Sequence, residues 1–250
     1  MSSVNKLLTK YNKGQAKLSM LTVYDYSMAK AMDGCVDIFL VGDSLGMVIY
    51  GQKNTHKVTM SQMIAHTRAV SLATSQSIVV ADMPKGSYEH NQKALVNANK
   101  LIKSGAEFVK IENYPDIADM LTKMGIKVFG HVGLTPQTIT DFKLQGKTLE
   151  SASKIKQTAL ELEKAGCSAV VLECIPQQLA KEITETLKIP TIGIGSGKFC
   201  DGQVLVSYDL LGLYNDFKPK FVKQYANLSQ QLQAASKEFD SEVKKGLFPV

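Results

Sequence analysis

One repeated pattern constrains the fold of this chain more than any other feature of its sequence. A helix-like segment ends near a glycine or proline, a short β-branched apolar run follows, and a polar residue ends the run. Such runs cover residues 18–25, 37–43, 77–82, 106–112, 126–131, 167–173 and 191–195, and residues 203–209 are a candidate eighth. Glycine after a helix end supplies a left-handed residue, and near-continuous apolar runs are typical of parallel strands buried on both faces.

Helical patterns separate these runs. Thr59 and Gln62 form a capping box ahead of one apolar stripe, further stripes lie within 94–102 and 155–162, and an amphipathic C-terminal helix is predicted at about 221–246. We find no linker and no shift in composition, which predicts a single domain over 1–250. About eight strands alternating with helices in 250 residues is typical of a TIM (β/α)8 barrel, with a doubly wound open sheet as the alternative.

Composition excludes several classes of protein. No apolar stretch approaches the roughly 18 residues of a membrane span, and the first ten residues lack the pattern of a secretory signal. The cysteines form neither a C-x-x-C pair nor a tight framework, so we expect a reduced, cytoplasmic protein rather than a disulfide scaffold or a zinc module. These cysteines are Cys35, Cys167, Cys174 and Cys200.

The net charge of +6 invites a nucleic-acid-binding interpretation, but the distribution of charge opposes it. Arg68 is the only arginine among 29 basic residues, and the lysines are scattered. Base recognition favours arginine, and phosphate recognition favours a basic stripe, so we expect neither a nucleic acid nor a membrane as partner. A non-enzymatic anion-binding protein remains an alternative that steep salt dependence without turnover would support.

The polar residues that end the apolar runs are the candidate functional residues, because sites in parallel α/β folds lie at the carboxyl ends of strands. They are Asp43, Asp82, Lys110, Glu112, His131 and Glu173. Unpaired carboxylates at one barrel mouth repel each other unless a cation neutralises them, and oxygen-only ligands favour magnesium over zinc. Asp43 and Asp82, with Glu112 behind them, are therefore the candidate metal site.

Each of these residues also has a structural interpretation. A strand-end aspartate often caps the next helix, a Lys-x-Glu pair is frequently a surface pair, and a lone histidine is often a buried structural residue. Lys110 and Glu112 are two residues apart, so on a strand their side chains share one face. The coincidence of all these residues at strand ends favours the functional interpretation.

Several motifs in order make the chain resemble the ketopantoate hydroxymethyltransferase family. The resemblance runs from about residue 21 to about residue 223, and the relatives of that family by fold are barrels of the phosphoenolpyruvate mutase/isocitrate lyase type. The motifs are Thr22-Val-Tyr-Asp-Tyr-Ser27, Leu40-Val-Gly-Asp-Ser-Leu-Gly-Met47, Ala81-Asp-Met-Pro84, Val109-Lys-Ile-Glu112, Gly130-His-Val-Gly-Leu-Thr-Pro-Gln137, Val171-Leu-Glu-Cys174 and Ile192-Gly-Ile-Gly-Ser-Gly197.

The resemblance implies a reaction and its participants. It implies transfer of a hydroxymethyl group from 5,10-methylenetetrahydrofolate to 3-methyl-2-oxobutanoate, through a magnesium-stabilised enolate, giving 2-dehydropantoate and tetrahydrofolate. This is the first committed step of pantothenate and coenzyme A biosynthesis. It also implies one Mg²⁺ per subunit and a homo-oligomer that in this family is commonly a decamer, a pentamer of dimers.

The resemblance also implies roles for individual residues. Glu173 is the expected proton acceptor, and His131 is a weaker candidate without an assigned role. Asp43, Asp82 and Glu112 are the expected metal ligands, Glu112 directly or through water. Asp43, Ser44, Asp82 and Lys110 are the expected contacts to the 2-oxo acid.

Two enzymatic alternatives and one departure from the family pattern remain. A magnesium-dependent lyase on the same fold would be expected to carry a catalytic cysteine in a K-x-C-G-H-like loop, which this chain lacks. A class I aldolase would use Lys110 as a Schiff base. The family's loop G-G-Y-x-V-Q-G-[KR] is altered here at residues 139–147, where the leading glycines are lost although Gln145 and Gly146 remain, so loop closure or folate affinity is expected to differ.

Overall fold

The computed structural model describes residues 16–139, 143–214 and 219–249 of the chain. It divides the chain into two compact units, Met1–Val204 and Leu205–Val250. The first unit contains nearly all of the barrel, and the second begins within the last strand. The single domain predicted for 1–250 stays a prediction.

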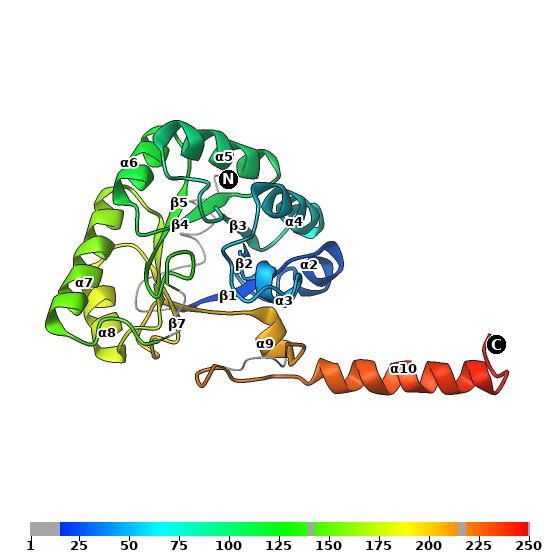
Figure 1. Ribbon diagram of the computed structural model, residues 1–250. Helices are drawn as coiled ribbons and strands as arrows, with labels where there is room; N and C mark the ends of the chain where they lie inside the picture. The colour runs from blue at the N-terminus through cyan, green and yellow to red at the C-terminus, as the bar shows by residue number, and fades with distance from the viewer. Residues whose placement is uncertain (1–15, 140–142, 215–218, 250) are drawn as a thin grey trace. The chain divides into compact units, whose positions relative to one another are not determined.

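Within the described residues, eight parallel strands close into a barrel in chain order, as the predicted TIM fold requires (Figure 1). The barrel confirms the predicted fold class and excludes the open sheet. The strands are β1 (Leu18–Thr22), β2 (Ile38–Val41), β3 (Ile78–Asp82), β4 (Phe108–Glu112), β5 (Val128–Gly133), β6 (Ala169–Glu173), β7 (Thr191–Ile194) and β8 (Gly202–Leu205).

Helices cover the outside of the barrel and connect successive strands from β1 to β7, whereas β7 continues to β8 without a helix in the described residues (Figure 1). In the first unit they are α2 (Tyr26–Met32), α3 (Leu45–Val48), α4 (Met60–Ala73), α5 (Asn91–Lys103), α6 (Pro115–Lys123), α7 (Leu149–Lys164) and α8 (Gln177–Thr186). The second unit holds α9 (Ser207–Leu211) and α10 (Leu228–Lys244).

Local sequence explains where these elements begin and end. The predicted capping box of Thr59 and Gln62 is present at the start of α4, where each side chain satisfies the other's backbone N–H. The glycines that follow α5 and α7, Gly105 and Gly166, have φ of 104° and 84°, a conformation that favours glycine. Local residues therefore determine where α4 begins and where α5 and α7 end, and the glycines follow the helices as the repeated pattern predicted.

Every second side chain along a strand points into the barrel. These side chains fill the barrel interior and, at the carboxyl ends of the strands, form the site. Phe108 of β4 and Phe129 of β5 belong to the central apolar cluster, and their ring centroids lie 4.9 Å apart. Two residues further along each strand, the same alternating face carries Lys110 and His131. The interior is thus apolar at its centre and polar toward the carboxyl ends of the strands.

Two predicted element boundaries need correction. The C-terminal helix was predicted at about 221–246, but α10 begins at Leu228 because the side chain of Asn227 caps it by accepting a hydrogen bond from Gln230 N–H. The candidate eighth strand was predicted to reach residue 209, but β8 ends at Leu205 and α9 follows from Ser207. No helix in the described part of the chain is long and apolar enough to cross a membrane.

Candidate active site

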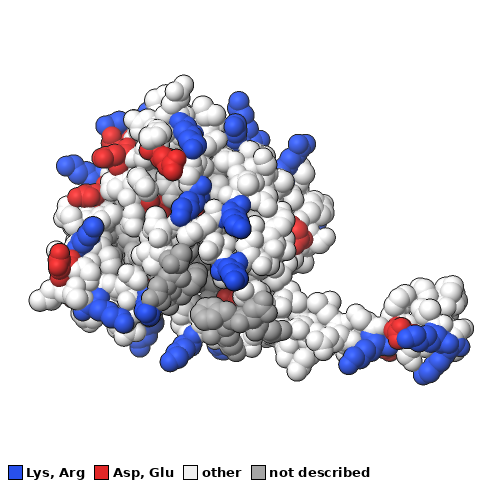
Figure 2. All heavy atoms as spheres, viewed as in Figure 1, with Lys and Arg blue, Asp and Glu red and all other residues white. Residues whose placement is uncertain are grey.

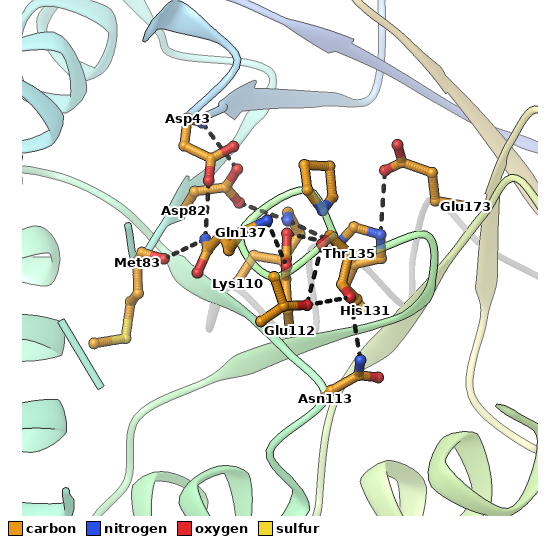
Figure 3. Close-up of polar contacts among 12 residues, drawn as sticks. Asp43, Asp82, Met83, Lys110, Glu112, Asn113, His131, Thr135, Gln137 and Glu173 are labelled. Carbon is orange, nitrogen blue, oxygen red and sulfur yellow. Dashed lines mark hydrogen bonds and ion pairs between the residues drawn. The ribbon is translucent and has the colours of Figure 1, made fainter. Parts of the chain in front are cut away.

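Two aspartates and a lysine form the first half of the site, at the ends of β2, β3 and β4 (Figure 3). The backbone N–H of Asp43 donates to Oδ2 of Asp82 over 3.0 Å, which ties the two acidic residues together. Nζ of Lys110 lies 2.9 Å from Oδ1 of Asp82, and both side chains are at most 5% exposed. The predicted aspartates and lysine therefore meet in one buried cluster.

The electrostatics of this cluster follow from burial and from an excess of carboxylates. Burial raises the pKa of Asp43 well above its ordinary value, and the nearby Asp82 and Glu112 carboxylates raise it further. Burial disfavours the charged form of Lys110, but the carboxylates of Asp82, Glu112 and Asp43 outweigh it and raise the pKa of the lysine. Lys110 is therefore a fixed cation among three carboxyl groups.

His131 connects the two halves of the site. Its Nδ1 lies 3.5 Å from Oε1 of Glu112 and 3.3 Å from Nζ of Lys110, and its Nε2 lies 3.2 Å from Oε2 of Glu173. Burial and the neighbouring Lys110 oppose protonation, but hydrogen bonds to Glu112 and Glu173 raise the pKa of His131 to about 9. The histidine, a weak candidate from sequence, lies at the centre of the site (Figure 3).

Glu173 is held at the last position of β6 by the backbone of the neighbouring strand. Its carbonyl accepts a hydrogen bond from Leu134 N–H over 2.8 Å. Gly133 makes this approach feasible, because its φ is 99° and a Cβ built there would lie 2.2 Å from the carbonyl oxygen of Glu173. The side chain of Glu173 is 17% exposed against 2% for that of His131, so this carboxylate is the more accessible of the pair.

Cys174, the residue after Glu173, has an unusual backbone conformation and a thiol that resists ionisation. Cys174 has φ of 48°, a left-handed conformation uncommon for a residue other than glycine. Burial, with the adjacent Glu173, raises the pKa of the Cys174 thiol to about 12, which opposes thiolate formation. Its carbonyl accepts a hydrogen bond from Gln145 N–H of the altered loop over 2.8 Å, while residues 140–142 of that loop lie outside the described residues.

Ser44 lies beside the aspartates but makes a different contact. Its Oγ is 2.8 Å from the hydroxyl of Tyr24. Ser44 is the N-cap residue of α3, yet its side chain makes no capping hydrogen bond. The Ser44 hydroxyl therefore belongs to the residue next to Asp43 and does not cap α3.

Two structural interpretations, the helix-capping aspartate and the surface Lys-x-Glu pair, do not hold. The N-cap residues of α3 and α5 are Ser44 and His90, so neither strand-end aspartate caps the helix that follows it. Lys110 and Glu112 are 5% and 2% exposed, which excludes a surface ion pair.

The sequence interpretation missed two residues, Gln137 and Tyr88. Nε2 of Gln137 donates to Oδ2 of Asp43 over 2.9 Å, and its backbone N–H donates to Oε2 of Glu112 over 3.2 Å. The hydroxyl of Tyr88 donates to Oε1 of Gln137 over 2.6 Å. Gln137 closes the motif that runs from Gly130, so its place in that motif was a usable signal, whereas Tyr88 lies in a loop without any motif.

A divalent cation fits the donor set of the two aspartates. Among the described residues, no three histidine, cysteine, aspartate or glutamate side chains are grouped as ligands of one metal ion. Magnesium, however, is commonly held by one or two carboxylates with water and substrate oxygens completing its shell. Asp82 Oδ1 pairs with Nζ of Lys110 over 2.9 Å, and Asp43 lies in a cluster with more carboxylates than cations, which favours a further cation there. Both oxygens of Glu112 face partners in the protein, His131 and Gln137, which suits a ligand acting through water.

Sequence comparisons agree on one family. The profile of the ketopantoate hydroxymethyltransferase family matches residues 2–250. A Caldicellulosiruptor bescii protein named 3-methyl-2-oxobutanoate hydroxymethyltransferase is 50% identical over 251 residues, covering 97% of this chain and 95% of that protein. A Thermotoga maritima protein of the same name is 49% identical over 255 residues, covering 99% and 94%.

Structural comparisons agree on the type of barrel. A 2,3-dimethylmalate lyase, described as a member of the phosphoenolpyruvate mutase/isocitrate lyase superfamily, superimposes with a TM-score of 0.63 at 14% identity, covering 100% of this chain and 90% of that one. Phosphonopyruvate hydrolase in complex with oxalate and Mg²⁺ gives a TM-score of 0.66 at 10% identity, covering 98% and 88%. These likenesses confirm the predicted barrel type and show the fold alone.

Proposed function

This chain belongs to the ketopantoate hydroxymethyltransferase family, and on that premise we propose that it transfers a one-carbon unit from 5,10-methylenetetrahydrofolate to C3 of 3-methyl-2-oxobutanoate. It is a transferase, a hydroxymethyltransferase of 3-methyl-2-oxobutanoate. The products of the proposed reaction are 2-dehydropantoate and tetrahydrofolate, in the first committed step of pantothenate and coenzyme A biosynthesis. The carbon arrives as a methylene group and leaves as hydroxymethyl, so one water is consumed.

One observation carries the proposal: a buried carboxylate–lysine cluster and a separate, more accessible carboxylate converge at the carboxyl end of one barrel. Asp43, Asp82 and Lys110 form the cluster, and Glu173 lies on the other side of His131 (Figure 3). Proton abstraction next to a ketone needs positive charge at the ketone oxygen and a free base near the carbon. The two halves of the site suit these two tasks.

Asp43 and Asp82 are the proposed direct ligands of one Mg²⁺, with Glu112 as the ligand through water. A magnesium ion bound there would act as a Lewis acid toward the carboxylate and ketone oxygens of the substrate. A barrel of the same fold, phosphonopyruvate hydrolase, is described in complex with Mg²⁺ and oxalate, a small molecule with a similar pair of oxygens. Lys110 adds a fixed positive charge beside Asp82, and the Oγ of Ser44 binds the 2-oxo acid.

Glu173 is the proposed base that takes the proton from C3. His131 carries its second proton at neutral pH, since its pKa is raised to about 9, and its Nε2 is 3.2 Å from Glu173 Oε2. This contact orients the carboxylate, while the other ring nitrogen faces Glu112. Once C3 has lost its proton, the resulting enolate carbon forms the new carbon–carbon bond to the one-carbon unit, whose two bonds to folate nitrogens break. Water supplies the hydroxyl group and one of the two protons that the nitrogens gain, and the proton taken from C3 supplies the other.

The protonation of Lys110 argues against the Schiff-base alternative. Schiff-base formation needs a neutral amine, and three carboxylates keep this lysine charged by raising its pKa. The lyase alternative lacks a cysteine in a K-x-C-G-H-like loop. The cysteine that follows Glu173 in sequence, Cys174, has a thiol pKa raised to about 12 by burial and by Glu173, which opposes its use as a thiolate.

We also propose small-molecule substrates and other copies of this chain as the partners, with a decamer built as a pentamer of dimers. Over the face seen in Figure 2, basic side chains are separated by neutral and acidic ones, which does not favour a nucleic-acid partner. A cytoplasmic location is proposed from the cysteines, all of which are free: Cys35, Cys167, Cys174 and Cys200.

The test is a reaction followed by proton NMR. Purified protein is incubated with 3-methyl-2-oxobutanoate, 5,10-methylenetetrahydrofolate and Mg²⁺, and the new hydroxymethyl resonance of 2-dehydropantoate is recorded. Matched reactions contain EDTA or lack the folate. Product in the complete reaction alone supports the proposal, and product without folate would refute the proposed donor.

A further inference from the structure

The side chains of Tyr88 and Gln137 form a buried chain of hydrogen bonds that ends on Asp43. We propose that these hydrogen bonds, which we call the Tyr88–Gln137 relay, fix the orientation of the Asp43 carboxylate so that it can bind a divalent cation. The inference rests on the proposed metal site at Asp43 and Asp82. It assigns functions to two residues outside the set predicted from sequence.

The carboxamide of Gln137 has a partner for each of its hydrogens. Nε2 donates to Oδ2 of Asp43 over 2.9 Å and to the carbonyl oxygen of Met83 over 2.9 Å. Oε1 accepts from the hydroxyl of Tyr88 over 2.6 Å. Gln137 is 2% exposed and Tyr88 is 4% exposed, so water does not readily replace these bonds.

Tyr88 determines which way the amide faces. Its hydroxyl oxygen accepts a hydrogen bond from the backbone N–H of Glu112 over 3.3 Å, which directs its own proton toward Gln137. Burial, more than the nearby Glu112, raises the pKa of Tyr88, so the phenol keeps that proton. A flipped amide would place its oxygen against two acceptors, Asp43 Oδ2 and the Met83 carbonyl, and is disfavoured.

The relay therefore holds two of the proposed metal ligands, Asp43 and Glu112. The amide occupies Oδ2 of Asp43, and within the described residues no hydrogen bond occupies the other oxygen, which stays available to a cation. The backbone N–H of the same glutamine holds Oε2 of Glu112 over 3.2 Å. The loop that carries Gln137 is itself anchored, since His56 Nε2 lies 3.0 Å from the carbonyl oxygen of Pro136.

The experiment measures Mn²⁺ binding to the substrate-free protein by electron paramagnetic resonance, which distinguishes free from bound ion. Tyr88→Phe removes the donor to the amide and keeps the ring, and Gln137→Leu removes the amide. Tyr114→Phe is the matched control, because the Tyr114 ring packs edge-on against Tyr88 at 5.4 Å and is 41% exposed. We expect Tyr88→Phe to weaken Mn²⁺ binding about tenfold, Gln137→Leu to weaken it further, and Tyr114→Phe to bind as wild type does.

A second measurement separates positioning from a general loss of structure. In Tyr88→Phe, turnover should recover to near the wild-type kcat at high Mg²⁺, with the Mg²⁺ concentration for half activation raised about tenfold. A Tyr88→Phe protein that melts as wild type does and binds Mn²⁺ with unchanged affinity would overturn the relay. Wild-type protein with no Mn²⁺ affinity above that of Asp82→Asn would instead overturn the metal site itself, and the relay's proposed purpose with it.

Discussion

Replacing Lys110 with methionine should reveal how strongly the site depends on one buried cation. The change keeps the length and apolar stem of the side chain and removes only its charge. Nζ of Lys110 lies 2.9 Å from Oδ1 of Asp82, and a Coulomb energy of about 6 kcal/mol follows at that separation with an effective dielectric constant of about 20. Removing one partner of a buried ion pair typically costs about 3–5 kcal/mol, because the other charge is left uncompensated.

We therefore expect Lys110→Met to lower the free energy of unfolding by about 3–5 kcal/mol at pH 7 and above. In a domain of this size that loss corresponds to a melting temperature lower by roughly 6–20 °C. Lys110 lowers the pKa of Asp43, so without the lysine Asp43 gains a proton more readily in the folded state, as burial and the nearby carboxylates already favour. A group with a raised folded-state pKa stabilises the fold as pH falls, so the deficit should shrink as pH falls below neutrality.

The assay is urea unfolding followed by circular dichroism at several pH values, with Lys123→Met as the control. Lys123 forms a shorter ion pair, 2.6 Å to Asp119 Oδ2, but its side chain is 73% exposed. A surface pair of that kind contributes at most about 1 kcal/mol. If Lys110→Met were no more destabilising than Lys123→Met, the reasoning from burial would be wrong.

Three further predictions concern the base, the metal and the fold. Glu173→Gln should lower turnover by about 10²–10⁴-fold while the affinity for 3-methyl-2-oxobutanoate changes little, as measured by steady-state kinetics and calorimetry. Wild-type turnover in that variant would exclude Glu173 as the base. Asp82→Ala should abolish the Mg²⁺ dependence of 2-oxo acid binding in the same calorimeter, and unchanged binding would refute the metal assignment. Asp33→Asn should destabilise the protein at pH 7, because the N–H groups of Ser77, Ser75 and Gln76 outweigh burial and hold the pKa of Asp33 below its ordinary value. That stabilisation is present above the unfolded-state pKa of about 3.9 and is lost as pH falls below it, so the urea midpoints of wild type and variant should converge in acid.

Most of the site could be predicted because it lies on strands. Alternation fixes which side chains enter a barrel, so Lys110 and Glu112 could be placed on one inward face by counting residues. His131 follows from the same count, two residues after the buried Phe129. Its contacts with Glu112 and Glu173 could not be predicted, because they depend on the register between β4, β5 and β6, which counting residues along one strand does not give.

The residues that were missed lie in loops, where no period applies. Gln137 reaches Asp43 across 94 positions of the chain, and Tyr88 reaches Gln137 across 49. Contacts of that kind depend on the paths of two loops, which neither hydrophobic periodicity nor turn chemistry determines. The start of α10 was misplaced for a related reason, because the apolar pattern extends back past the residue, Asn227, that caps the helix.

The most direct test of the proposed chemistry is exchange of the C3 hydrogen of 3-methyl-2-oxobutanoate in deuterated water, followed by proton NMR. It isolates proton abstraction from the later steps, and a parallel sample contains tetrahydrofolate in case exchange requires it. We expect exchange with wild-type protein and Mg²⁺, loss of exchange with EDTA, and loss of exchange in Glu173→Gln. Exchange that persists in Glu173→Gln, or that fails in every wild-type sample, would contradict a metal-assisted proton abstraction by Glu173.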